Sequence, residues 1–246
     1  MNSAAQVFTN WLVAIYPNTS RPIVIFCGTG NNGGDGVAVA RLLHCLGFAA
    51  KVIVCDFAKK HSADFDEQIA SLPQHDNILV EWIKTVETLP AFTVETLVID
   101  ALFGVGLNRP LEDEWAQVVD YLNSLPNEVV AIDLPSGLFA DRHTPGTAVV
   151  QADRTFSFER PKLAFFFPEN AERVGEWAFG SIGLTPDFDH HTETSYYYLT
   201  KKDVVSLRQS RKKFSHKGSF GHALLVAGSF GKMGAAVLSA RACLRS

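Results

Sequence analysis

A glycine-rich segment between two apolar runs restricts the possible folds of this chain more than any other feature. Residues 23–27 read IVIFC, a β-branched and aromatic run that predicts a strand buried on both faces. GTGNNGGDG follows at residues 28–36, and the apolar-periodic VAVARLLHCLGF after it predicts a helix ending near Gly47. KVIVC at residues 51–55 predicts a second buried strand. This order indicates a βαβ unit with parallel strands and a right-handed crossover.

The same alternation of apolar runs and helical segments continues along the chain. Glu112 to Asn123 reads as a helix. Further strands are predicted at residues 78–83, 96–99, 129–132, 154–158, 164–167 and 177–182. We therefore predict an α/β fold, a doubly wound and mostly parallel sheet with helices on both faces, which is a Rossmann-like three-layer sandwich.

Composition excludes several classes of protein. The 246 residues are 47% hydrophobic and 20% charged, enough to bury a core and unlike a disordered chain. The net charge of −4 provides no basic excess for nucleic acid, and no apolar run approaches the ~18 residues of a membrane span. The first ten residues lack the pattern of a secretory signal, and the four cysteines form no CxxC pair. We expect a cytoplasmic protein with reduced thiols that binds neither nucleic acid nor membrane.

The composition divides the chain into three parts. Residues 1–184 carry the α/β pattern, and residues 185–195 read TPDFDHHTETS, a polar linker. His190 and His191 in this linker can bind a metal, but adjacent histidines in a polar stretch are more often solvated. Residues 196–246 hold a helix at 199–207 and then the start of a second strand, glycine loop and helix. We interpret this last part as the incomplete beginning of another domain.

The glycine loop matches a known phosphate-binding pattern. Gly28, Gly30 and Gly33 satisfy GxGxxG after a strand, and Asp56 follows about 20 residues on, where a dinucleotide fingerprint has its ribose-binding acid. Glycines allow backbone N–H groups to approach a phosphate at a helix N-terminus. One interpretation of the chain is therefore an NAD-dependent oxidoreductase.

Three polar residues in the loop argue against that simple interpretation. Asn31, Asn32 and Asp35 exceed what a plain fingerprint needs, and two amides and a carboxylate can bind hydroxyls or a hard cation. The alternative is a strained turn with local side-chain hydrogen bonds. We favour a binding loop because so many special residues coincide.

Two more loops follow predicted strands. They are DALFGVGLNRP at residues 100–110 and DLPSG at residues 133–137. A single aspartate at a strand end is often only a cap or turn residue. Three loops at the carboxyl ends of parallel strands, however, converge on one crevice. Lys162 lies between two predicted strands and either points into this crevice or is an exposed loop residue.

These segments resemble the NAD(P)HX epimerase family, the YjeF N-terminal domain. The similarity covers residues 22–184 and lies in GTGNNGGDGVAVARLL, VIDALFGVGLNRPL, AIDLPSGL and TFSFERPKLAFFFPENAERVGEWAFGSIGL. MNSAAQVFTNWL resembles the end of the family's first helical segment. The tail from residue 196 resembles the opening of an ADP- or ATP-dependent NAD(P)HX dehydratase, a ribokinase-like domain that many bacterial proteins fuse to the epimerase.

The resemblance implies a reaction. NAD(P)HX is hydrated NAD(P)H with a hydroxyl on C6 of the reduced nicotinamide ring, and the family interconverts its R and S epimers for an S-specific dehydratase. The chain is then an isomerase of nicotinamide cofactor repair. The full-length protein would also be a hydro-lyase that uses ADP or ATP, but this chain lacks the downstream nucleotide motif, so we expect no dehydration from it. The family also implies a homodimer or higher homo-oligomer.

The resemblance also implies site residues. A potassium ion is expected at Asn32, Asp100 and Ser136. The expected substrate contacts are Asn31, Asn32, Gly33, Gly34, Asp35, Gly104, Val105, Gly106, Leu107, Asn108, Arg109, Pro110 and Asp133. Asp133 is our acid–base candidate, because burial at a strand end can raise the pKa of a carboxylate. Lys162 is the second catalytic candidate.

A non-catalytic role is the remaining alternative. Relatives of this fold act as scaffolds, and such modules can lose the acids of the site. This chain keeps Asp35, Asp100 and Asp133, which favours catalysis.

Overall fold

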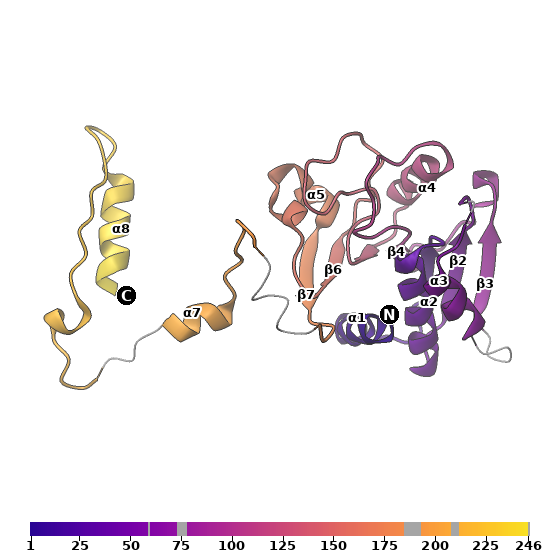
Figure 1. Ribbon diagram of the computed structural model, residues 1–246, viewed down its shortest axis with the longest axis horizontal. Coiled ribbons are helices and arrows are strands. Elements are labelled where there is room, and N and C mark those ends of the chain that lie inside the picture. Colours follow the sequence, from indigo (N-terminus) through magenta and orange to yellow (C-terminus); the bar gives the residue numbers. More distant parts are fainter. Residues whose placement is uncertain (59, 73–77, 185–192, 208–211, 246) are drawn as a thin grey trace. The chain divides into compact units, whose positions relative to one another are not determined.

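The chain forms two compact units, Met1–His190 and His191–Ser246. The computed structural model describes residues 1–58, 60–72, 78–184, 193–207 and 212–245 (Figure 1). Most of the predicted linker, including His190 and His191, lies outside the described residues. The boundaries predicted at residues 184 and 195 therefore stay predictions.

A single seven-stranded sheet organises the first unit. Its strands run in the order β3-β2-β1-β4-β5-β6-β7, and every neighbouring pair is parallel. The strands are β1 (Ile23–Cys27), β2 (Ala50–Cys55), β3 (Leu79–Ile83), β4 (Leu97–Ala101), β5 (Val129–Ile132), β6 (Arg154–Phe158) and β7 (Glu176–Gly180). The chain order reverses between β1 and β4, which makes this the switch point of a doubly wound sheet. The predicted fold class is confirmed.

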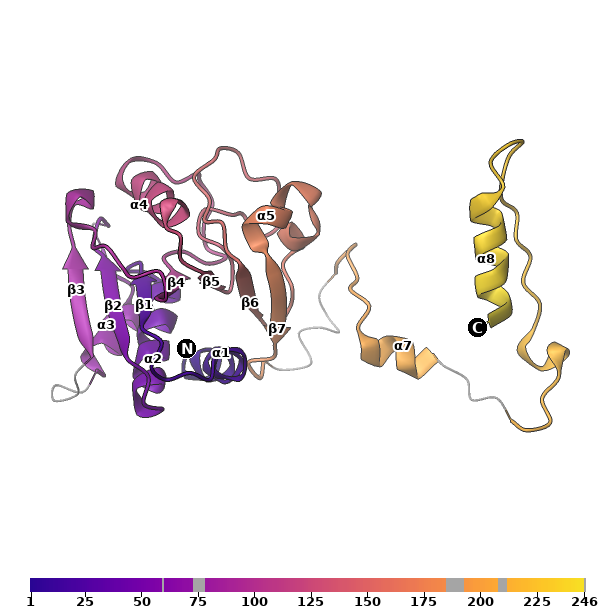
Figure 2. The same ribbon diagram turned by 180° about the vertical axis from the view of Figure 1, so that it is seen from behind.

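Helices cover both faces of the sheet (Figure 1, Figure 2). The helices of the first unit are α1 (Asn2–Ile15), α2 (Asn31–Cys45), α3 (Ala63–Ala70), α4 (Asp113–Ser124) and α5 (Ala171–Val174). The short 3₁₀ segments are η1 (Val86–Thr88), η2 (Leu163–Phe166) and η3 (Pro168–Asn170). Ile25 of β1 packs into a core shared with α1, α2 and α3, whereas Phe26 packs into a second core that contains α4. Burial on both faces explains why the strand is continuously apolar.

The strand predicted at residues 164–167 is wrong. The segment forms the 3₁₀ turn η2, which Pro161 precedes and Pro168 follows. β7 pairs directly with β6, so the intervening segment has no place in the sheet. Phe165 instead packs on a small core formed with Leu134 and Leu138, which covers the loop after β5.

The second unit contains α7 (Lys201–Leu207), the 3₁₀ turn η4 (Lys217–Phe220) and α8 (Gly234–Arg245). The strand predicted before its glycine loop is absent from the described part of this unit, where a single bridge joins Ser229 to Lys232. A strand needs a pairing partner, and this segment has none here. In the described ranges of the whole chain, no helix has the length and apolar content required to cross a bilayer.

Candidate functional site

The three predicted loops meet at the carboxyl ends of β1, β4 and β5. The Gly28 N–H donates to the Ala101 carbonyl at 3.1 Å, which joins the first loop to the end of β4. Asn32 lies against the second loop, because a Cβ built on Gly104 would stand 3.2 Å from Asn32 Oδ1. The Phe103 N–H donates to Ser136 Oγ at 2.8 Å and so joins the second loop to the third. The structure thus brings together the loops that the sequence separates.

The glycine-rich segment forms the first turns of α2, which starts at Asn31 rather than after Gly36 as the sequence predicted. Close packing is the reason. A Cβ on Gly33 would lie 1.6 Å from the Gly28 carbonyl oxygen, and a Cβ on Gly36 would lie 2.7 Å from both Cys27 Sγ and Ala101 Cβ. These glycines let the helix rest directly on the strands. Gly33 and Gly34 are buried, whereas Gly30 and Asn31 are exposed.

Asp100 and Ser136 form a buried polar cluster. Ser136 donates to the Asp100 carboxylate through its backbone N–H at 2.8 Å and through its hydroxyl at 2.6 Å. The Leu102 N–H adds a third hydrogen bond at 3.1 Å. Burial raises the pKa of Asp100 to about 6, although the hydrogen bonds from Ser136 and Leu102 favour the charged form. This carboxylate fixes the loops after β4 and β5 relative to each other.

Asp133 and Lys162 form an ion pair. Lys162 Nζ lies 2.8 Å from Asp133 Oδ1, and the two side chains are only 16% and 10% exposed. The Phe158 N–H donates to the same carboxylate at 3.0 Å, and Lys162 donates to the Phe158 carbonyl at 3.0 Å. Of the two positions left open for Lys162, the structure shows the one that faces Asp133.

Backbone conformation at this pair is unusual. Asp133 has φ 65° and Glu159, in the loop that delivers Lys162, has φ 61°. Such left-handed conformations are costly for residues other than glycine and cluster at functional sites. The Glu159 carboxylate accepts hydrogen bonds from Ser181 Oγ at 3.0 Å and from the Ile182 N–H at 2.9 Å, which ties the loop to the end of β7.

Asp35 lies close enough to Asp133 for their charges to interact. Its Oδ1 is buried and has no hydrogen-bond partner. Burial raises the pKa of Asp35 to about 7, the Met1 ammonium opposes this shift, and the charges of Asp133 and Asp64 add to it. This carboxyl group titrates near neutral pH at the mouth of the crevice.

Asp35→Asn should therefore stabilise the protein at pH 8 more than at pH 4. The pKa of this carboxyl is near 3.8 in the unfolded chain and about 7 in the folded protein. The parent protein therefore has its full stability below about pH 4, and its free energy of unfolding falls as the pH rises toward 7. The limit for one proton is ~1.4 kcal/mol per pH unit. Urea denaturation across this range, with the exposed Asp120→Asn as control, measures the effect. Parallel pH profiles for parent and Asp35→Asn would contradict it.

The second loop, residues 104–110, is mostly at the surface. Leu107 is half-buried, its N–H donates to the Gly104 carbonyl at 3.3 Å, and it packs on the core that contains α4. Arg142 donates to the Asn108 carbonyl at 3.0 Å. The exposed members of the loop are Val105, Gly106, Asn108, Arg109 and Pro110.

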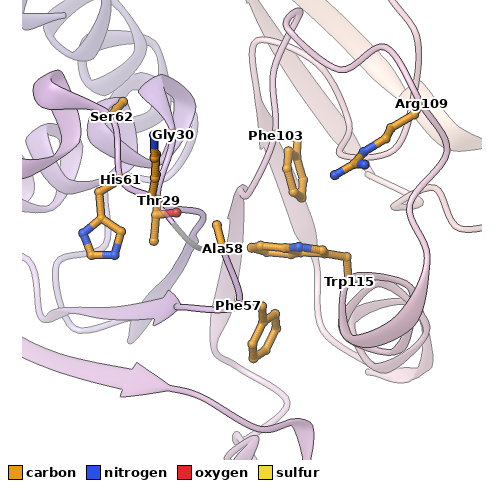
Figure 3. A pocket seen from close by; sticks show the side chains of 10 residues that line it. Thr29, Gly30, Phe57, Ala58, His61, Ser62, Phe103, Arg109 and Trp115 are labelled. Carbon is orange, nitrogen blue, oxygen red and sulfur yellow. The ribbon is translucent and has the colours of Figure 1, made fainter.

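A cavity of about 710 Å³ opens beside the first two loops (Figure 3). Its lining residues are Thr29, Gly30, Phe57, Ala58, Lys60, His61, Ser62, Phe103, Arg109 and Trp115. In Figure 3, Phe57, Trp115 and Phe103 form one wall, and His61, Ser62 and Thr29 lie across from them. This size suits a small-molecule ligand.

Only Arg109 among the predicted substrate contacts is part of this lining. Phe57 directly follows the strand-end Asp56, and Phe103 closely follows Asp100. Their places beside strand-end aspartates are a sequence signal that could have identified both residues. Trp115 comes from α4 and His61 from the loop before α3, and no local pattern marks either one.

His61 changes the interpretation of Asp56. His61 Nε2 lies 3.0 Å from Asp56 Oδ1, and its Nδ1 lies 3.0 Å from Asp66 Oδ1. The hydrogen bond to Asp56 is the main cause that raises the pKa of His61. The acid at the end of β2, which a dinucleotide-binding enzyme uses for ribose, is already paired here.

A doubly wound parallel sheet with a crevice at its switch point defines an α/β protein of the Rossmann-like, ligand-binding class. Sequence comparison narrows this class. The family described as YjeF-related protein N-terminus matches residues 1–164, and the chain belongs to this family. The predicted resemblance is thereby confirmed.

Several full-length relatives are similar to this chain. A bifunctional NAD(P)H-hydrate repair enzyme from Dictyoglomus turgidum is 31% identical over 100% of the chain and 48% of its own length. The enzyme of that name from Escherichia coli is 30% identical over 94% of the chain and 44% of its own length. The enzyme of that name from Thermofilum pendens is 35% identical over 90% of the chain and 42% of its own length. The chain therefore spans about half the length of the curated relatives it matches.

A solved structure supports the fold. The crystal structure of yeast ynu0, YNL200c, superposes with a TM-score of 0.63 over 82% of this chain and 86% of the yeast chain. The identity is 19%, so the likeness is one of architecture.

Proposed function

We propose that this chain is an NAD(P)HX epimerase, an isomerase that interconverts the R and S forms of hydrated NAD(P)H. The observation that carries the proposal is the largely buried Asp133–Lys162 pair, 2.8 Å apart, beside three converging loops. The printed names of the relatives, NAD(P)H-hydrate repair enzymes, supply the substrate class.

The mechanism needs a group that exchanges a proton with the C6 hydroxyl of the substrate. Epimerisation requires the C6 hydroxyl to leave or the ring to open at C6. The broken bond to C6 then forms again on the other face of the ring. Asp133 exchanges the proton with this hydroxyl, and Lys162 holds the carboxylate in place through the ion pair. The exposed start of α2 faces the pyrophosphate, where the helix N-terminus stabilises negative charge.

A chromatographic assay tests the proposal. Purified protein is mixed with a single separated epimer of NADHX, and the appearance of the other epimer is followed. We expect interconversion far above the spontaneous rate. Failure to accelerate interconversion of either NADHX or NADPHX would contradict the proposed activity.

We also propose a potassium ion at the predicted ligands Asn32, Asp100 and Ser136. These side chains carry hard oxygen donors, the type that alkali and alkaline-earth cations accept. Asn32 Nδ2 is buried without a partner, and rotation of this amide would present its oxygen there. The ion would hold the three loops together.

Potassium should raise the melting temperature of the parent protein and lower its KM. Asp100→Asn should lose this response, because the charge that attracts the ion is removed. The measurement compares thermal unfolding in potassium chloride and choline chloride at equal ionic strength, with Asp153→Asn as control. An equal potassium response in Asp100→Asn and the parent would move the ion to another place.

The competing oxidoreductase is disfavoured by the pairing of Asp56 with His61. The relatives are about twice as long as this chain. We propose that a protein of that length would also dehydrate the S form with ADP or ATP. We also propose a homodimer or higher homo-oligomer, because the family resemblance implies one, and a cytoplasmic location, because the four cysteines read as reduced thiols.

A further inference from the structure

The cavity of Figure 3 and the Asp133–Lys162 pair are built from different parts of the sheet edge. Its lining comes from the ends of β1, β2 and β4 and from α4. The ion pair lies at the ends of β5 and β6. Gly30, the N-cap of α2, lines the cavity.

The sheet order separates the strand ends that carry the ion pair from the far side of the cavity. β5, β4, β1 and β2 are successive neighbours in the sheet, so three strand spacings of about 4.8 Å separate the ends of β5 and β2, or about 14 Å. If the nicotinamide ring reacts at Asp133 and the pyrophosphate lies at the start of α2, the other nucleoside reaches the cavity. A mononucleotide would leave the cavity empty.

The wall of the cavity has the chemistry of a nucleobase site. Trp115 lies edge-on to Phe57 and to Phe103, with ring centroids 5.0 and 4.6 Å apart. All three side chains are only partly buried, so part of each ring is accessible. A purine has a large π-face that stacks on such side chains. Arg109 and Lys60 at the rim supply positive charge for the phosphates that accompany it.

We infer that this cavity binds the adenosine half of the dinucleotide, with Trp115 as the main base contact and Arg109 as a phosphate contact. This inference rests on the proposed function for the direction in which the substrate lies. It makes the enzyme selective for whole dinucleotides over hydrated nicotinamide mononucleotide.

Calorimetric titration with 5′-AMP tests the cavity without any reaction. We expect the parent to bind AMP, Trp115→Leu to bind it about tenfold or more weakly, and Trp115→Phe to stay within about threefold of the parent. Trp177→Leu on β7 is the matched control and should bind like the parent. Arg109→Ala, a surface change that leaves the core intact, should weaken AMP but not adenosine.

Several outcomes would overturn the inference. AMP that fails to bind the parent, or binds Trp115→Leu as tightly, removes the adenosine site. If nicotinamide mononucleotide binds instead of AMP and binds Trp115→Leu more weakly, the nicotinamide half occupies the cavity and the substrate lies in the opposite direction. Thermal unfolding identifies a misfolded Trp115→Leu, in which case Arg109→Ala decides: equal binding of AMP to it and to the parent counts against the site.

Kinetics separate this inference from the proposed function. Trp115→Leu should raise the KM for NADHX about tenfold with little change in kcat, and should leave kcat/KM for hydrated nicotinamide mononucleotide unchanged. AMP binding without any epimerisation would refute the proposed function and keep the nucleotide site. Epimerisation without AMP binding would refute the site and keep the function.

Discussion

Asp133→Asn should slow the interconversion of the NADHX epimers at least ~100-fold and leave the fold intact. Loss of a general acid–base group costs ~10²–10⁴-fold in rate, whereas loss of one hydrogen bond costs only ~1 kcal/mol of stability. Asparagine has nearly the same shape as aspartate but cannot exchange a proton. The two roles of Asp133, catalytic and structural, therefore predict different results.

The backbone explains why this variant should fold. Asp133 has φ 65°, and asparagine is one of the few residues that tolerate this region. The amide oxygen of the new side chain can still accept from the Phe158 N–H, which lies 3.0 Å from the carboxylate. Alanine tolerates this backbone region less well and cannot accept the hydrogen bond from Phe158. A loss of activity in Asp133→Ala could therefore come from instability as well as from the missing carboxylate.

Chromatography of the two epimers measures the rate, and circular dichroism confirms the fold. Asp153→Asn is a matched control, because Asp153 accepts from the Val129 N–H at the opposite ends of β5 and β6. This control should react at the parental rate. A soluble Asp133→Asn protein with near-parental epimerisation would assign the proton transfer to Lys162 or a water.

Gly33→Ala should destabilise the protein by about 3 kcal/mol or more, or prevent it from folding. The added Cβ would lie 1.6 Å from the Gly28 carbonyl oxygen and 2.6 Å from its carbonyl carbon. Both obstacles are backbone atoms, so no side-chain rotation relieves the clash. Helix α2 would have to lift from β1, and the buried contacts of Val37 and Val39 would be lost with it.

Gly30→Ala is the matched control in the same loop. A Cβ on Gly30 meets nothing within 4 Å, and its φ of −96° suits any residue. Gly30 is the N-cap of α2, where alanine is a poor cap, so a loss of about 1 kcal/mol is expected. Urea denaturation of the two variants gives the comparison. Equal stability losses would mean that the close approach of Gly33 to β1 does not govern the stability of this loop.

The sheet was predictable from local pattern because burial on both faces leaves a clear mark. The strands at residues 23–27 and 129–132 contain apolar residues throughout and match the observed β1 and β5 residue for residue. The aspartates at the strand ends also marked the crevice, because parallel strands end on one edge. The segment at residues 164–167 was misread because apolar residues that pack under a loop resemble a strand in composition.

The sequence alone was sufficient for the fold class, for the glycine and aspartate loops, and for the family, since each depends on residues close together in the chain. Only the tertiary structure decided which groups meet. It paired Lys162 with Asp133, engaged Asp56 with His61, and set Trp115 beside Phe57 and Phe103. These contacts join separate elements, and their distances depend on how helices and loops pack on the sheet, which no local pattern records.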